Sequence, residues 1–141
     1  MVLRYAFLAS AAELNREQRV SALGIGIHGL LVPQLPAVVP SLVLVLQIHF
    51  DLEDCGVPHG VRVTAEGPDR VPMGIGASTN LVGELPPYFP EHGSASDSLF
   101  TFYNVSFDQE GIYQIHIEID GKRIKTVNFA VVVVRQSSTG G

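Results

Sequence analysis

The chain has 141 residues with 46% hydrophobic side chains, so it can bury one core but is too short for two ordinary domains. Its net charge of −5 argues against nucleic acid or an anionic membrane surface as a partner. The lone Cys55 cannot form a disulfide within the chain, which indicates a reducing, cytoplasmic compartment.

The N-terminal part predicts two strands, residues 4–10 and 19–32, joined by a hairpin turn at 15–18. Residues 11–18 also have good helix propensity, so two helical turns there remain an alternative. Gly24, Gly26 and Gly29 have the GxGxxG spacing of dinucleotide sites, but the prolines that follow prevent the helix such a site needs. We interpret this run as a twisted or bulged strand.

Residues 42–52 predict a strand that starts between two layers and emerges at an edge. The apolar part is far shorter than the roughly 20 residues that span a bilayer, so no membrane segment is expected. Strand alternation would place His49, Asp51 and Glu53 on one face, where imidazole and carboxylates suit zinc. Because no strict metal spacing is present, these three are weak candidates, and neither a metal nor another cofactor is predicted.

Two shorter strands, 61–66 and 71–75, precede the longest irregular segment, 78–97, which contains several prolines and glycines. A loop of this length in a compact domain usually carries function or a partner contact. Tyr88 and Phe89 within it offer a stacking platform for a carbohydrate or another small molecule.

The C-terminal hairpin is the strongest local signal in the sequence. Two β-rich runs flank Asp120-Gly121, a pair typical of the type I′ turn. Across a two-residue turn, Glu118 is expected to face Arg123, and His116 to face Lys125.

Seven or eight short strands with turn signals about every ten residues predict an all-β fold. We expect a single antiparallel β-sandwich over residues 1–135, of immunoglobulin-like architecture, closing with the long C-terminal hairpin. Asp108, Gly111 and Tyr113 have the spacing found at the tyrosine corner of such domains, where the hydroxyl bonds back to the backbone.

Three segments carry a closer resemblance: Ala6-Phe7-Leu8-Ala9-x-x-Ala12-Glu13, then Leu23-Gly24-Ile25-Gly26, and the ending Gly111-x-Tyr113…Ile119-Asp120-Gly121…Val127-x-Phe129-x-Val131. They resemble an uncharacterised bacterial family of β-sandwich proteins known only as a domain of unknown function. The resemblance implies a fold and supplies no catalytic residues.

The residues after the last strand form a flexible polar tail, 136–141, that ends in Gly140-Gly141. Ubiquitin-like modifiers end in a similar diglycine, so conjugation or processing at this end is an alternative function. The long helix of those proteins is not evident in the sequence.

The excess of apolar residues is the main indication of function. Mean hydropathy is +0.26, and the four valines 131–134 would expose their outer face in an isolated sandwich, as would Leu42–Leu46. With no nucleophile elbow, phosphate-binding loop or catalytic acid pair in view, an enzyme is not expected. We predict a non-enzymatic protein that binds itself, as a homo-oligomer, or another protein through Val132 and Val134. The alternatives are the diglycine modifier and a small-molecule or carbohydrate-binding module.

Overall fold

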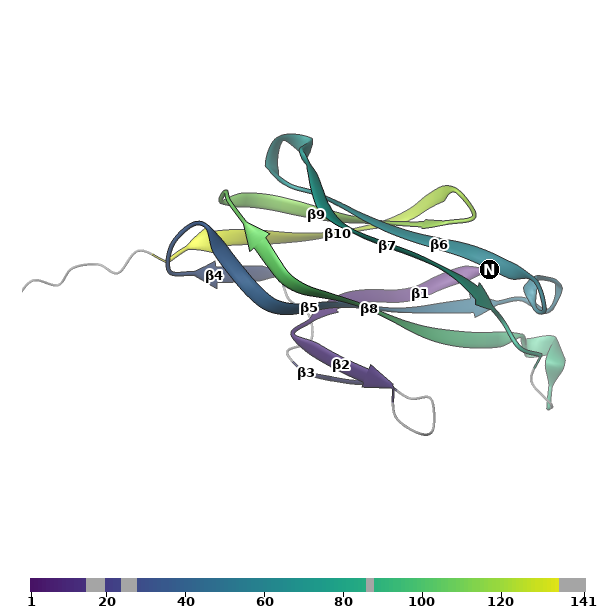
Figure 1. The fold of residues 1–141 in the computed structure, drawn as a ribbon. Helices are drawn as coiled ribbons and strands as arrows, with labels where there is room; N and C mark the ends of the chain where they lie inside the picture. The colour runs from purple at the N-terminus through teal and green to yellow at the C-terminus, as the bar shows by residue number, and fades with distance from the viewer. Residues whose placement is uncertain (15–19, 24–27, 86–87, 135–141) are drawn as a thin grey trace, which may run out of the picture.

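The computed structural model describes residues 1–14, 20–23, 28–85 and 88–134, which are built mainly from strands (Figure 1). In chain order the strands are β1 (Val2–Ala9), β2 (Ala11–Leu14), β3 (Val20–Leu23), β4 (Gly29–Val32), β5 (Ala37–Phe50), β6 (Pro58–Glu66), β7 (Pro72–Val82), β8 (Ser94–Phe107), β9 (Gly111–Ile119) and β10 (Lys122–Val133). Short 3-10 turns occur at Leu52–Asp54, Pro68–Arg70 and Pro90–His92. The predicted all-β class is confirmed, but the described strands outnumber the seven or eight expected.

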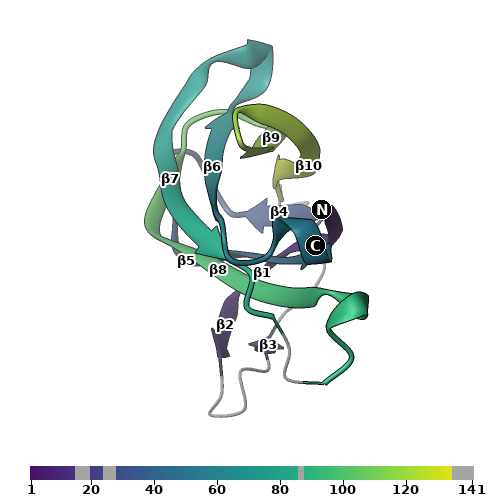
Figure 2. The same cartoon turned by 90° about the vertical axis from the view of Figure 1, so that its right-hand side faces the viewer.

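Two facing sheets hold the core between them. The smaller sheet has the order β1-β5-β8, and the larger has the order β4-β10-β9-β6-β7. Figure 2 shows that the larger sheet curls over the smaller one. The prediction of a wholly antiparallel fold is wrong, because β4 runs parallel to β10. The two strands lie far apart in sequence, so no hairpin turn dictates their relative direction.

The core is formed by alternate residues of both sheets, as the strand period requires. From β5 and β9 it takes Leu42, Leu44, Leu46, Ile48, Phe50, Tyr113, Ile115, Ile117 and Ile119. At one end, the rings of Phe107, Tyr113 and Phe129 pack with centroids 5.0 to 5.9 Å apart. Burial of each large side chain contributes about 2 kcal/mol, so this layer dominates stability.

The hairpin of β2 and β3 forms a third layer beneath the smaller sheet (Figure 1). Its two strands pair antiparallel, so the helix alternative is wrong for residues 11–14; the predicted turn at 15–18 lies outside the described residues. Ala12 and Ala22 pack on Val43 and Val45, which are 2% and 0% exposed. The expectation of an exposed outer face at Leu42–Leu46 is therefore wrong, because this hairpin covers it.

The C-terminal hairpin forms as predicted, but with one change of register. Asp120 and Gly121 have φ values of 52° and 80°, which a type I′ turn requires. Glu118 lies opposite Arg123 as expected, whereas His116 lies opposite Thr126 rather than Lys125. The prediction for Lys125 is wrong because a bulge between Arg123 and Lys125 inserts one residue, Ile124, into β10.

The type I′ turn provides a test of the hairpin. We expect Gly121→Ala to reduce the free energy of unfolding by about 1 kcal/mol, because the backbone at this position has positive φ. No atom lies within 4 Å of the added Cβ, so the loss would come from the backbone alone. Urea denaturation measures it.

Gly74→Ala is the matched control. It also adds a methyl group in open space, but at a strand position of β7 without positive φ, so stability should stay unchanged or rise slightly. Equal losses in the two variants would contradict the turn geometry.

Candidate functional site

Four large apolar side chains lie exposed near the end of β10. Leu31 is 73%, Ile112 56%, Val132 45% and Val134 47% exposed, and we call these four residues the apolar patch. Val132 lies opposite Leu31 of β4, while Ala130, one step back on the same face, lies opposite Ile112 of β9. The patch therefore spans three adjacent strands and is continuous rather than a scatter of single residues.

The backbone beside the patch presents a free strand edge. Among the described strands, β4 is the last of its sheet and pairs only with β10. The carbonyls of His28 and Val32 accept hydrogen bonds from β10, both at 2.9 Å. Because backbone groups alternate in direction along a strand, those of Gly29 and Leu31 point away from β10. At the end of β10, beyond the residues that pair with β9, the Val133 amide donates a hydrogen bond of 2.6 Å to the Glu110 carboxylate.

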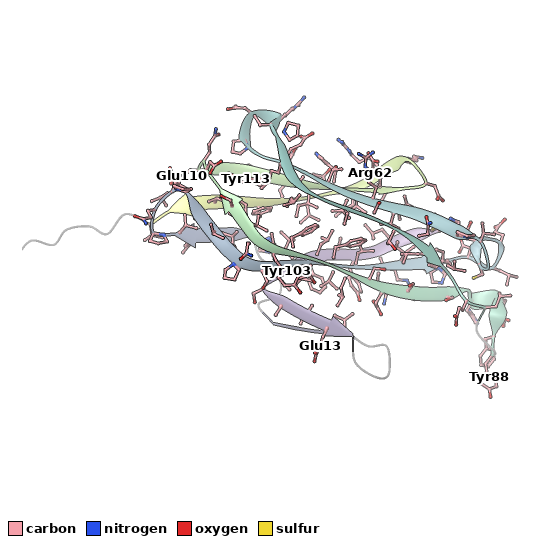
Figure 3. All side chains as sticks on the ribbon, in the orientation of Figure 1. Glu13, Arg62, Tyr88, Tyr103, Glu110 and Tyr113 are labelled. Carbon is pink, nitrogen blue, oxygen red and sulfur yellow. The ribbon has the colours of Figure 1, made fainter. Side chains whose placement is uncertain are left out.

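The predicted loop 78–97 is shorter than expected. Residues 78–82 pair with β6, and residues 94–97 pair with the end of β5, which leaves 83–93 as the connection. Tyr88 and Phe89 are 78% and 69% exposed, and Figure 3 shows Tyr88 projecting away from both sheets. Phe89 has a φ of 52°, unusual for a bulky residue, and its ring lies 6.2 Å from that of His92.

A polar group occupies the smaller sheet next to this loop. Asp97 accepts hydrogen bonds from the Tyr5 hydroxyl at 2.6 Å and from the Gln47 amide at 3.0 Å. Burial, together with the Asp97 carboxylate, raises the pKa of Tyr5 to about 12. Tyr5 thus stays protonated and acts as a donor that ties β1 to β8.

The three weak metal candidates are not arranged as a ligand set. Strand β5 ends at Phe50, so Glu53 lies in the 3-10 turn instead of on a common strand face with His49 and Asp51. His49 Nδ1 is 3.8 Å from Asp51 Oδ1, and its Nε2 lies 2.8 Å from the His92 carbonyl. Within the described residues, no group of three or more His, Cys, Asp or Glu is placed to hold a metal ion.

His59 and Asp120 join the tip of the C-terminal hairpin to β6. The buried His59 ring lies 2.8 Å from Asp120 Oδ2 through Nδ1 and 2.8 Å from the Asp54 carbonyl through Nε2, and Asp120 Oδ1 accepts the Gly60 amide. The hydrogen bond to Asp120 raises the pKa of His59, and the same bond lowers the pKa of Asp120. Since both ring nitrogens are engaged, His59 is not placed to activate Cys55, whose thiol is 4.0 Å from the Phe50 carbonyl.

His116 is buried, although it lies on the outer face of the larger sheet. It is 3% exposed, and its Nδ1 is 2.9 Å from Thr126 Oγ1. Nε2 is 3.3 Å from Glu66 Oε2 but lacks the alignment of a hydrogen bond. The bulge in β10 created this pairing with Thr126, so a sequence reading without the bulge could not find it.

Two predicted features lie outside the described residues. The tail 136–141 with Gly140 and Gly141 is one of them, and Gly24 and Gly26 of the GxGxxG pattern are the other. Gly29, the last glycine of that pattern, begins β4. The helical elements of the described residues are all short 3-10 turns. None of them is long and apolar enough to cross a membrane.

Comparison with protein families matches residues 4–132 to DUF6941, described as a family of unknown function. The chain belongs to this family. The resemblance to an uncharacterised family is thereby confirmed over nearly the whole described chain. A comparison with curated proteins finds no match.

Two of the solved structures to which this DUF6941 protein is similar are those of larger proteins. The alkylpurine DNA glycosylase AlkC of Pseudomonas fluorescens aligns at 9% identity and a TM-score of 0.44, over 74% of this chain and 28% of that one. A β-glucosidase from Listeria innocua aligns at 10% identity and a TM-score of 0.48, over 77% of this chain and 15% of that one. The chain thus spans less than a third of either protein's length.

The pair of His59 and Asp120 predicts a pH dependence. A raised His59 pKa means that its contribution to stability is complete below the ordinary value of 6.5 and is lost as pH rises through the folded value. The lowered Asp120 pKa adds a contribution that is present above 3.8 and is lost as pH falls through the folded value. The stability advantage of the wild type over Asp120→Asn should therefore be largest between these limits.

Urea unfolding of both proteins from pH 4 to 9 measures this difference. Asparagine tolerates positive φ, so the variant keeps the turn and removes only the charge. The advantage should shrink steadily above pH 6.5. A difference that stays constant over the whole range would show that the two side chains are not coupled.

Proposed function

We propose that this protein is a non-enzymatic interaction module that associates with a second copy of itself through the apolar patch and the free edge of β4. The observation that carries the proposal is the continuous exposure of Leu31, Ile112, Val132 and Val134 on three adjacent strands. Such a surface leaves apolar area exposed to water unless a partner covers it.

The edge of β4 favours an identical partner. Gly29 and Leu31 direct their backbone groups away from β10, toward a second β4, and two such edges paired antiparallel form a two-fold, self-complementary contact. The patches of both copies then lie on the same side of a continuous sheet, where the two Leu31 side chains meet. The sequence of β4, Gly-Leu-Leu-Val, contains none of the charges that natural edge strands use against pairing.

The architecture that we propose for the module is an immunoglobulin-like β-sandwich. It is supported by the Tyr113 hydroxyl, which donates a hydrogen bond of 2.7 Å to the Gln109 carbonyl at the corner before β9. The setting that we propose is the cytoplasm, consistent with a free, half-buried Cys55.

A second candidate function uses the loop 83–93 to bind carbohydrate. The exposure of Tyr88 and Phe89 favours it, because sugar rings stack on exposed aromatic faces. Titration of the ¹⁵N-labelled protein with a panel of neutral oligosaccharides should shift the amides of this loop, and a Tyr88→Ala/Phe89→Ala variant should show no shift. Unchanged spectra across the whole panel would remove this candidate.

Light scattering over a concentration series tests the leading proposal. We expect the mass of the wild type to rise above the 15.2 kDa of one chain as concentration increases. Val132→Lys and Val134→Lys should restore the monomer mass, because each places a charge in the apolar contact.

Val82→Lys is the matched control. Val82 is 48% exposed on β7, at the opposite edge of the same sheet, so a lysine there should leave association unchanged. Circular dichroism checks that all three variants fold. A wild type that stays at 15.2 kDa at every concentration, or equal effects of all three lysines, would refute association through the patch.

A further inference from the structure

A cavity of about 570 Å³ opens between the two sheets at the start of β10, far along that strand from the apolar patch. It lies where β1 of the smaller sheet approaches β10 of the larger one. Its lining residues are Met1, Val2, Leu3, Ile119, Asp120, Lys122, Ile124 and Lys125. The volume lies within the roughly 300–1,000 Å³ typical of small-molecule sites.

Two lysines line this cavity, and the bulge at Ile124 brings the second of them, Lys125, to it. Lys122 lies opposite Ile119, and Lys125 lies opposite Ile117, whose side chains both point into the core. Paired residues share a face of the sheet, so both lysines lie on the side that faces the other sheet. Without the bulge, Lys125 would lie opposite His116 on the outer face.

The positive charge of these lysines is not neutralised within the described part of the chain. Neither Lys122 nor Lys125 forms an ion pair with a described residue. Asp120 also lines the cavity, but its carboxylate oxygens contact His59 Nδ1 and the Gly60 amide rather than either lysine. The cavity therefore combines two available cations with an apolar wall of Leu3, Ile119 and Ile124.

We propose that this cavity binds a small amphipathic anion, in which a carboxylate or phosphate head group contacts Lys122 and Lys125 and an apolar chain lies along the wall. An apolar pocket with a few converging charged groups is the usual form of such a site. An inward lysine on a free sheet edge also discourages edge pairing. One inward lysine is enough to discourage edge pairing, so that role explains neither the second lysine on the same face nor the cavity that both lysines line.

Calorimetric titration with sodium decanoate, kept below its micelle concentration, tests the site. The wild type should bind decanoate and should bind decanol, which has the same chain without the charge, at least fivefold more weakly. The double variant Lys122→Gln/Lys125→Gln should also lose at least fivefold in decanoate affinity. In ¹³C-methyl spectra, decanoate should shift Ile119 and Ile124, whereas Ile112 in the apolar patch should remain unshifted.

Arg123→Gln is the matched control. It removes one positive charge from the same strand, but its position opposite Glu118 lies on the other face, so decanoate affinity should not change. Absence of decanoate binding, or an equal loss in Arg123→Gln and in the double variant, would overturn the proposal. Equal affinity for decanol and decanoate would overturn the assignment of the two lysines.

The source of the head group is distinguished with vesicles. Sedimentation with phosphatidylglycerol and with phosphatidylcholine vesicles is compared for the wild type and the double variant. A free ligand predicts decanoate binding without sedimentation, whereas a lipid head group predicts sedimentation with phosphatidylglycerol alone that the double variant loses. Neither the decanoate titration nor the vesicle sedimentation depends on self-association through the apolar patch. The ligand proposal and the association proposal can therefore fail independently.

Discussion

The register of the β9–β10 hairpin is the constraint on which the rest of the structure depends. The type I′ turn at Asp120-Gly121 starts the pairing, and the bulge at Ile124 then shifts it by one residue. A shift of one residue exchanges the two faces of a strand. Phe129 and Val131 consequently enter the core, 2% and 1% exposed, while Val132 turns outward.

The same shift makes the two ends of β10 chemically different. Lys122, before the bulge, and Lys125, just after it, both lie on the face that points toward the smaller sheet, beside the cavity. Beyond the segment paired with β9, Val132 and Val134 join Leu31 in the apolar patch. One strand thus carries a candidate ligand site at its start and a candidate contact surface at its end, and the His59–Asp120 pair holds the hairpin tip that precedes both.

Much of the fold could be predicted from local patterns. The Asp-Gly turn, the alternation of β9 and the apolar run of β5 have direct physical causes, and all three appear in the structure. The bulge was missed, although the sequence contained its signal. Continuous pairing from a two-residue turn would place Thr126 and Asn128 in the core and Val127 and Phe129 outside, which contradicts their polarity.

The remaining errors concern contacts between segments distant in sequence. Val132 and Val134 were identified as exposed, but Leu31 and Ile112 became their neighbours only through strand pairing that no turn dictates. The cover over Val43 and Val45 comes from a short hairpin whose position depends on tertiary packing. The loop was predicted too long because Ser78 and Ser96 have little strand propensity of their own; pairing with β6 and β5 places them in strands.

Cross-strand nuclear Overhauser contacts in the ¹⁵N,¹³C-labelled protein test the register most directly. The structure predicts contacts of Thr126 with His116 and of Val127 with Ile115. Contacts of Lys125 with His116 and of Val127 with Gln114 would instead show an unbulged hairpin. That result would move Lys125 to the outer face and remove the structural basis of both the cavity and the patch.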